Sequence, residues 1–106
     1  RAIMVKYGDG NKQIALLEFG WTSDPRPDSP YFWHAVSEQT KGEYMVRAFR
    51  YAKEHWSPWI GLMSLIYVSD PDWAEADEQY WWSINWPSYP EFKPRPAYDA
   101  LKAMPK

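Results

Sequence analysis

Residues 14–21, Ile-Ala-Leu-Leu-Glu-Phe-Gly-Trp, carry more structural information than any other stretch of this chain. They begin as a continuous apolar run, which is typical of a strand buried on both faces in a parallel sheet. The run ends in one carboxylate, Glu18, followed directly by an aromatic residue and a glycine. In α/β barrels the catalytic groups stand at this end of the strands. We therefore expect a strand over residues 13–18 and consider Glu18 either a catalytic group or a structural acid held by a backbone N–H or a lysine.

The length and charge of the chain exclude several classes of function. With 106 residues it is long enough for one small domain. A formal net charge of −2 and the lack of a basic patch argue against nucleic-acid binding. No apolar segment reaches the roughly 18 residues that a membrane span needs, so we expect no membrane partner. The chain has no cysteine, which excludes disulfides and cysteine-ligated metals but leaves the cellular compartment open.

Aromatic residues are unusually frequent in this chain. They make up 19% of it, including eight Trp and eight Tyr. Core packing is one explanation, because each large ring can bury about 150–250 Å². Sugar binding is the other, since the apolar face of a pyranose can lie flat on an indole. Composition alone leaves both explanations open.

Apolar periodicity and capping residues predict an alternation of helices and strands. We expect helices over residues 1–7, 37–56 and 96–104, with strands over 13–18 and 59–68. This order of helix, strand, helix, strand, helix is typical of an α/β fold whose two strands are parallel. Long loops follow both strands, whereas the loop that enters the first strand is short. Such asymmetry is characteristic of the active-site face in α/β folds.

Two stretches resemble one family of enzymes. Residues 14–21 resemble strand seven of the clan A retaining glycoside hydrolases, and the ending Pro94-Arg95-Pro96-Ala97-Tyr98-Asp99-Ala100-Leu101 resembles their closing helix. The resemblance spans the chain, from the end of helix six to helix eight. It implies that residues 1–106 form the C-terminal part of a (β/α)₈ TIM barrel. Cellulase-like and β-xylosidase-like enzymes share these motifs, so the sugar is not specified.

The resemblance implies that Glu18 is a nucleophile that attacks an anomeric carbon. A retaining mechanism needs a second carboxyl group about 5–5.5 Å away as acid/base. In these families that residue follows strand four in an Asn-Glu-Pro sequence, and this chain has no Asn-Glu pair. A complete barrel requires roughly 250 residues. We therefore expect the chain to carry the nucleophile of a glycosidase without its acid/base, and to be inactive alone.

Four aromatic residues are candidates for sugar binding. Trp21 follows the first strand, and Trp33 lies in the long loop after it. Tyr67 ends the second predicted strand, at a position where the resemblance implies an aromatic residue below the sugar, and Trp73 lies in the next loop. Packing is the alternative for each of them. If the chain lacks catalytic activity, these residues favour a carbohydrate-binding module, or an interaction module with aromatic anchors.

No cofactor and no metal is expected from the sequence. The acidic loop over residues 70–78 lacks the Asp-x-Asp-x-Asp-Gly register of a dedicated calcium loop, so a solvated charged loop is the simpler interpretation. The expected partners are an oligo- or polysaccharide and further polypeptide. Two parallel strands leave both sheet edges unpaired, and such edges bind other strands. We expect the remainder of a barrel, or further copies of the chain, to cover them.

Overall fold

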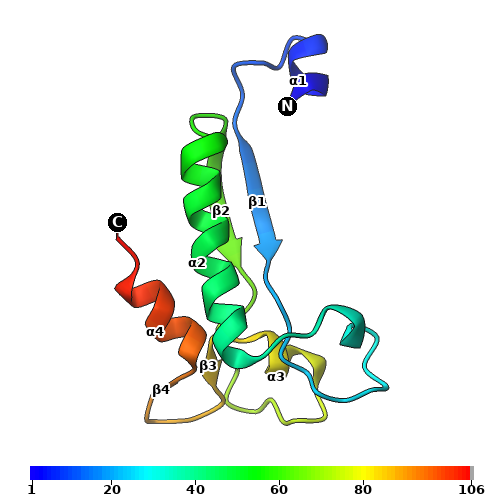
Figure 1. Ribbon diagram of the computed structural model, residues 1–106, viewed down its shortest axis with the longest axis vertical. Coiled ribbons are helices and arrows are strands. Elements are labelled where there is room, and N and C mark those ends of the chain that lie inside the picture. The colour runs from blue at the N-terminus through cyan, green and yellow to red at the C-terminus, as the bar shows by residue number, and fades with distance from the viewer. Residues whose placement is uncertain (106) are drawn as a thin grey trace.

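The fold is a mixed arrangement of helices and strands (Figure 1), seen in a computed structural model that describes residues 1–105. Its elements are α1 (Ala2–Lys6), β1 (Ile14–Phe19), the 3₁₀ helix η1 (Phe32–His34), α2 (Glu38–His55), β2 (Ile60–Leu65), α3 (Glu78–Trp82), β3 (Asn85–Trp86), β4 (Lys93–Pro94) and α4 (Pro96–Ala103).

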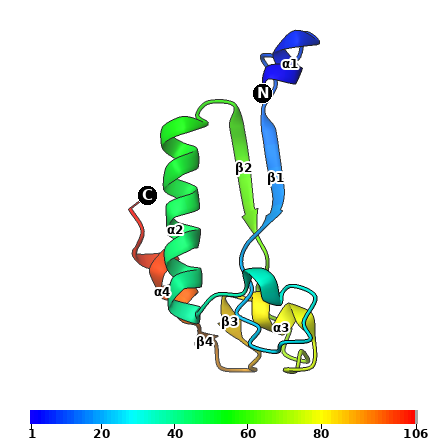
Figure 2. The same cartoon turned by 45° about the vertical axis from the view of Figure 1, so that its right-hand side comes forward.

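The central unit is a parallel pair of strands joined by a long helix. β1 and β2 pair side by side, with Ile14 opposite Ile60 and Phe19 opposite Leu65. Figures 1 and 2 show α2 lying along one face of this pair, with both strands pointing toward the same end of the molecule. The expected α/β arrangement with two parallel strands is therefore confirmed. β3 and β4 form a separate antiparallel pair.

The sequence explains why α2 begins and packs where it does. The Ser37 hydroxyl accepts a hydrogen bond from the Thr40 backbone N–H at 3.1 Å, which caps the helix as expected. The predicted apolar stripe faces the sheet and includes Met45 and Ala52, which are both buried. Further along the stripe, the Phe49 ring meets the edge of Phe19 of β1 at 5.3 Å between centroids. This stripe holds α2 against the two strands.

The closing helix α4 packs against α2 at a point where neither helix has a large side chain. Gly42 of α2 is buried, and a Cβ added there would lie 3.1 Å from the Cα of Ala97. Ala97 itself is fully buried. Pro96 starts α4, in agreement with the prediction, because proline suits the first helical position. The two helices can therefore approach closely.

The prediction that both strands are buried on both faces is wrong for this chain. β1 and β2 contain no buried residue. Leu17 is 68% exposed and Leu62 is 53% exposed. The physical reason is that α2 covers only one face of the pair, and Figure 2 shows no element of the described chain over the other face. We call this second face, with Leu17 and Leu62, the uncovered face.

The predicted order of elements is correct but incomplete. The chain between β2 and α4 was expected to be one long loop, and it contains α3, β3 and β4. β2 is also shorter than the predicted strand over residues 59–68. Trp82, at the end of α3, is 8% exposed and provides much of the apolar burial in this region. Buried charged side chains donate hydrogen bonds to backbone carbonyls of this segment. The apolar periodicity of the sequence does not reveal such contacts.

The molecule is elongated, with extents of 46 × 32 × 23 Å. Its radius of gyration is 16.0 Å, whereas a compact domain of this length has about 13 Å. Helix α1 stands apart from the body, beyond the start of β1 (Figure 1). Within residues 1–105, no helix combines the length and apolarity needed to cross a membrane.

Candidate functional site

The C-terminal ends of β1 and β2 bring Glu18 and Tyr67 close to each other. Glu18 lies one residue before the end of β1 and is exposed, and Tyr67 follows β2 by two residues. Burial raises the pKa of the Tyr67 hydroxyl, and the negative charges of Glu18 and Glu78 raise it further. The Tyr67 hydroxyl is therefore protonated at neutral pH and can donate a hydrogen bond to a bound ligand.

Trp73 belongs to the same surface. Its ring packs edge-on against Tyr67, with 5.6 Å between ring centroids and an interplanar angle of 73°. A turn holds the backbone of this loop, since the Trp73 N–H donates to the Asp70 carbonyl at 3.2 Å. Glu18, Tyr67 and Trp73, three of the residues expected from the sequence, thus come together at one end of the sheet.

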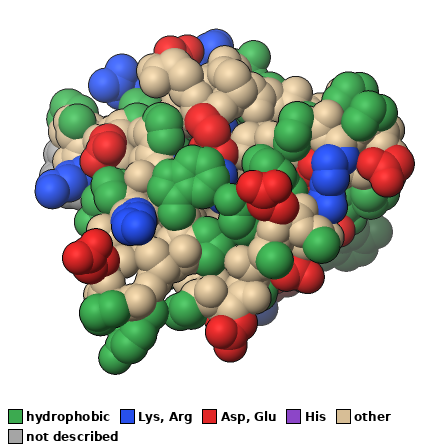
Figure 3. Space-filling view, turned by 90° about the horizontal axis from the view of Figure 1, so that it is seen from below, with side chains coloured by type: hydrophobic (Ala, Val, Ile, Leu, Met, Phe, Trp, Pro, Cys, Tyr) green, Lys and Arg blue, Asp and Glu red, His purple; other side chains and the backbone are tan. Residues whose placement is uncertain are grey.

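The loop after β1 contributes a second aromatic group. Trp33 in η1 is 81% exposed, and its ring lies 4.5 Å from that of His34. The His34 ring in turn lies 5.2 Å from Trp82 of α3, and Tyr31 lies 5.4 Å from the same indole. Figure 3 views this end of the molecule and shows hydrophobic side chains near its centre with acidic side chains among them. An exposed indole is therefore available in the loop after β1.

Trp21 has different surroundings from the other candidates. Its ring packs edge-on against Tyr44 of α2, with 5.5 Å between centroids. It also lines a groove of about 410 Å³ together with Arg47, Ala48 and Tyr51 of the same helix. The structure thus places Trp21 against α2 and gives it a packing contact there.

A cluster of charged residues, not expected from the sequence, lies next to these loops, and two of its three members are fully buried. Lys41 of α2 is fully buried, and its ammonium donates to the Ser23 hydroxyl and to the carbonyls of Trp81 and Ser83, each at 3.1 Å. The same ammonium lies 3.0 Å from Oε2 of Glu38. Lys41 therefore ties the loop after β1 to the C-terminal end of α3.

Arg95 completes this cluster from the start of α4. Its side chain is fully buried and forms an ion pair with Glu38 of α2. The guanidinium also donates to the Tyr80 carbonyl at 2.8 Å and lies 3.6 Å from the ring centroid of Trp86. Below we call Glu38, Lys41 and Arg95 the polar cluster.

Burial dominates the electrostatics of Lys41. It lowers the pKa of Lys41 from 10.5 to about 8, although the nearby Glu38 carboxylate opposes this effect. A charged residue one turn into a helix normally faces solvent, so the position of Lys41 in the sequence did not indicate that it is buried. The proline-flanked position of Arg95 in the Pro-Arg-Pro ending was the one visible hint of a structural role.

A second buried ion pair shapes the loop after β1. Asp24 is fully buried and accepts two hydrogen bonds from the guanidinium of Arg26, at 2.8 and 2.7 Å. The hydrogen bond from Arg26 lowers the pKa of the Asp24 carboxyl, and desolvation opposes it. The first residues of the loop after β1 are therefore held by an ionised carboxylate.

The arrangement offers one accessible carboxylate beside aromatic surfaces. Among residues 1–105, no group of three or more His, Cys, Asp or Glu side chains is placed to hold a metal ion. Glu18 can serve as a nucleophile or a base toward a ligand that lies against Tyr67 and Trp73. Comparisons of the chain with protein-family models, with curated proteins and with solved structures gave no match.

Proposed function

We propose that the chain is the nucleophile-bearing part of a retaining glycoside hydrolase, and that its parallel pair is the final portion of a (β/α)₈ barrel. The observation that carries this proposal is the position of Glu18. An accessible carboxylate stands at the C-terminal end of a parallel strand, beside a tyrosine and a tryptophan from the neighbouring strand end. The motif over residues 14–21 and the ending over residues 94–101 support the same assignment.

In this proposal the Glu18 carboxylate attacks the anomeric carbon of a sugar. A covalent bond forms between one carboxylate oxygen and that carbon, while the bond to the leaving oxygen breaks and the leaving group departs with the electron pair. Tyr67 and Trp73 provide the surface on which the sugar lies. With ordinary glycosides the departing oxygen needs a proton, which a second carboxyl group about 5–5.5 Å from Glu18 would supply. We assign that group to further polypeptide, and the substrate to oligo- or polysaccharides.

A second candidate function is carbohydrate binding without catalysis. The 81% exposure of Trp33 favours it, because an uncovered indole can stack on a pyranose without any further residue. Titration of tryptophan fluorescence with oligosaccharides, followed by calorimetry, measures such binding. Binding that is lost in Trp33→Ala and unchanged in Glu18→Gln supports this second function.

The nucleophile can be tested without the acid/base. A 2-deoxy-2-fluoro-glycosyl fluoride carries a leaving group that departs unprotonated, and its fluorine at C2 slows release of the sugar from the carboxylate. We expect the intact mass of the chain to rise by one fluorosugar residue, with the label in the peptide that contains Glu18. Gluco- and xylo-configured reagents should both be tried, because the motif does not specify the sugar.

Matched variants decide whether the labelling is specific. Glu18→Gln should remain unlabelled, whereas Glu78→Gln, which removes the other carboxylate near Tyr67, should still be labelled. Circular dichroism checks that both variants keep the fold. Labelling that persists in Glu18→Gln, or no labelling with either reagent, contradicts the proposed role of Glu18.

A further inference from the structure

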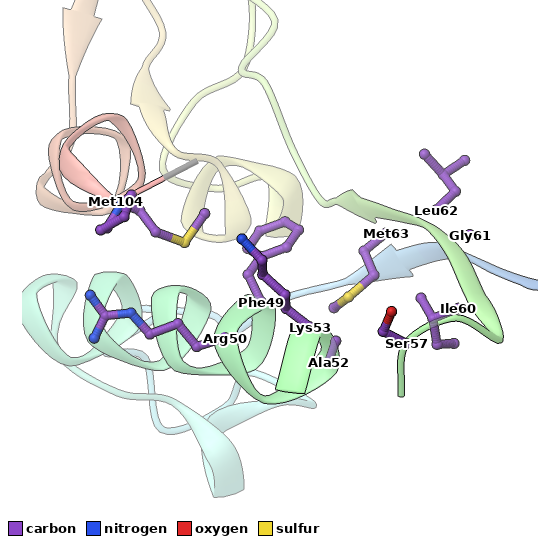
Figure 4. A pocket seen from close by; sticks show the side chains of 11 residues that line it. Phe49, Arg50, Ala52, Lys53, Ser57, Ile60, Gly61, Leu62, Met63 and Met104 are labelled. Carbon is purple, nitrogen blue, oxygen red and sulfur yellow. The ribbon is translucent and has the colours of Figure 1, made fainter. Parts of the chain in front are cut away.

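The free edge of β2 lies beside an open groove. This groove has a volume of about 360 Å³ and is lined by residues 60–63 of β2, by one side of α2 and by Met104 and Pro105. Figure 4 shows Met63 pointing toward α2 and Leu62 pointing away from it, onto the uncovered face. No residue of β1 lines the groove. It is therefore located on the side of β2 that has no neighbouring strand.

The chain exposes more surface than a monomer of its mass ordinarily does. Its accessible surface is 7238 Å², whereas a folded monomer of 12.6 kDa exposes about 6,200 Å². The difference is about 1,000 Å². One partner in a stable complex buries about 800 Å². The excess is thus what one association of standard size would remove from water.

Exposed apolar side chains are also found at α1, beyond the start of β1. Ile3 of α1 is 73% exposed, and Tyr7, the residue that follows the helix as its C-cap, is 72% exposed. α1 precedes β1 and projects beyond the start of that strand (Figures 1 and 2). The groove likewise reaches the start of β2, where Ser57 and Ile60 line it.

We propose that the free edge of β2 binds β1 of a second copy of the chain in parallel, with α1 of that copy beyond the end of the groove at Ser57. This joint repeats the pairing already present between β1 and β2, and it keeps α2 of every copy on the same side. Leu17 and Leu62 then lie on the opposite side, which becomes the interior when the joints close into a ring. Four copies joined in this way contain eight strands, the number at which inward side chains just fill a closed barrel.

The joint differs from the symmetric alternative, in which two β2 edges pair with each other. A bond from β2 to β1 is heterologous, whereas pairing between two β2 strands is isologous. The inference concerns the chain by itself, because further polypeptide would occupy the same edges in the proposed barrel. It uses only the strand edges and the exposed face, and it does not rest on the proposed function. A failure of association therefore leaves the labelling of Glu18 to be judged by itself.

Cross-linking between single-cysteine chains tests the joint, because the natural chain has no cysteine. Ala15 of β1 and Leu62 of β2 are paired within one copy. If the joint between copies has the same register, Leu62 of one copy also lies beside Ala15 of the next. We expect a short bismaleimide to join Ala15→Cys chains to Leu62→Cys chains when the two are mixed. Leu62→Cys chains alone should give little product. Equal cross-linking of Leu62→Cys chains with one another would overturn the heterologous joint.

Sedimentation of the full chain tests association itself. We expect species heavier than 12.6 kDa that increase with protein concentration. Leu62→Lys should shift this equilibrium at least tenfold toward the monomer, because it places a charge on the uncovered face without disturbing the packing on α2. Tyr89→Lys, at a residue that is 86% exposed and lies in the β3–β4 connection and not in the β1–β2 pair, is the matched control and should associate as the natural chain does. A monomer at millimolar concentration would overturn the proposal.

Discussion

Replacement of Lys41 by methionine should change how the stability of the chain depends on pH. Lys41 has an ordinary pKa of 10.5 in the unfolded chain, and burial lowers it to about 8 in the folded chain. Between these two values the unfolded chain binds more protons than the folded one. The free energy of unfolding must therefore rise as the pH rises from about 8 to 10.5. At about 1.4 kcal/mol per pKa unit, the rise amounts to about 3 kcal/mol.

The assay is chemical denaturation at fixed protein concentration over this pH range, for the natural chain and for Lys41→Met. Tyrosines also titrate in this range, but their contribution is common to both proteins and cancels in the difference. We expect the natural chain to gain about 3 kcal/mol relative to Lys41→Met between pH 8 and 10.5. Lys102→Met, at an exposed lysine of α4 outside the groove, is the matched control and should retain the gain.

Direct titration provides an independent check. In carbon NMR of side-chain-labelled lysine, the resonance absent from Lys41→Met should titrate near pH 8 in the natural chain. The reasoning is refuted if that resonance titrates near 10.5, or if Lys41→Met shows the same rise in stability as the natural chain.

Three further substitutions test the packing and the loops. Gly42→Ala places a Cβ 3.1 Å from Ala97 Cα and should cost about 1–3 kcal/mol by forcing α2 and α4 apart, measured by denaturation; an unchanged stability contradicts this contact. Ser37→Ala removes the N-cap of α2 and should cost about 1 kcal/mol in the same assay, whereas Ser37→Asp should not. Arg26→Met removes the hydrogen bonds that lower the pKa of Asp24, and their stabilisation exists above pH 3.8 and is lost as the pH falls. The variant should lose less stability than the natural chain on acidification, and an equal loss would exclude the pair as its source.

The sequence predicted the main elements because their signals are local. The apolar stripe and the Ser37 cap predicted α2 to within a residue at each end, and Pro96 predicted the start of α4. The parallel pairing of the two strands was also predicted, because a helix connects the first strand to the second. Gly8 directly follows the first predicted helix, and its φ of +86° lies in the left-handed region that glycine accepts readily.

What the sequence missed depends on contacts between distant segments. Lys41 is buried because carbonyls some forty residues later accept its hydrogen bonds, and no local pattern announces this. Leu17 was expected to be buried, because an apolar run is typical of a strand that is covered on both faces. It is exposed because no element of the described chain covers the second face of the pair. At the candidate site, the positions of Glu18 and Tyr67 at two strand ends predicted that they lie at the same end of the sheet. They did not predict that Trp21 packs against α2.

The most direct test of the central proposal is the mass of the peptide that contains Glu18 after treatment of the chain with a 2-deoxy-2-fluoro-glycosyl fluoride. We predict a gain of one fluorosugar residue, located on the Glu18 side chain by fragmentation and absent from Glu18→Gln. An unmodified Glu18 peptide, or a label distributed over the other carboxylates, would contradict the assignment of Glu18 as a glycosidase nucleophile.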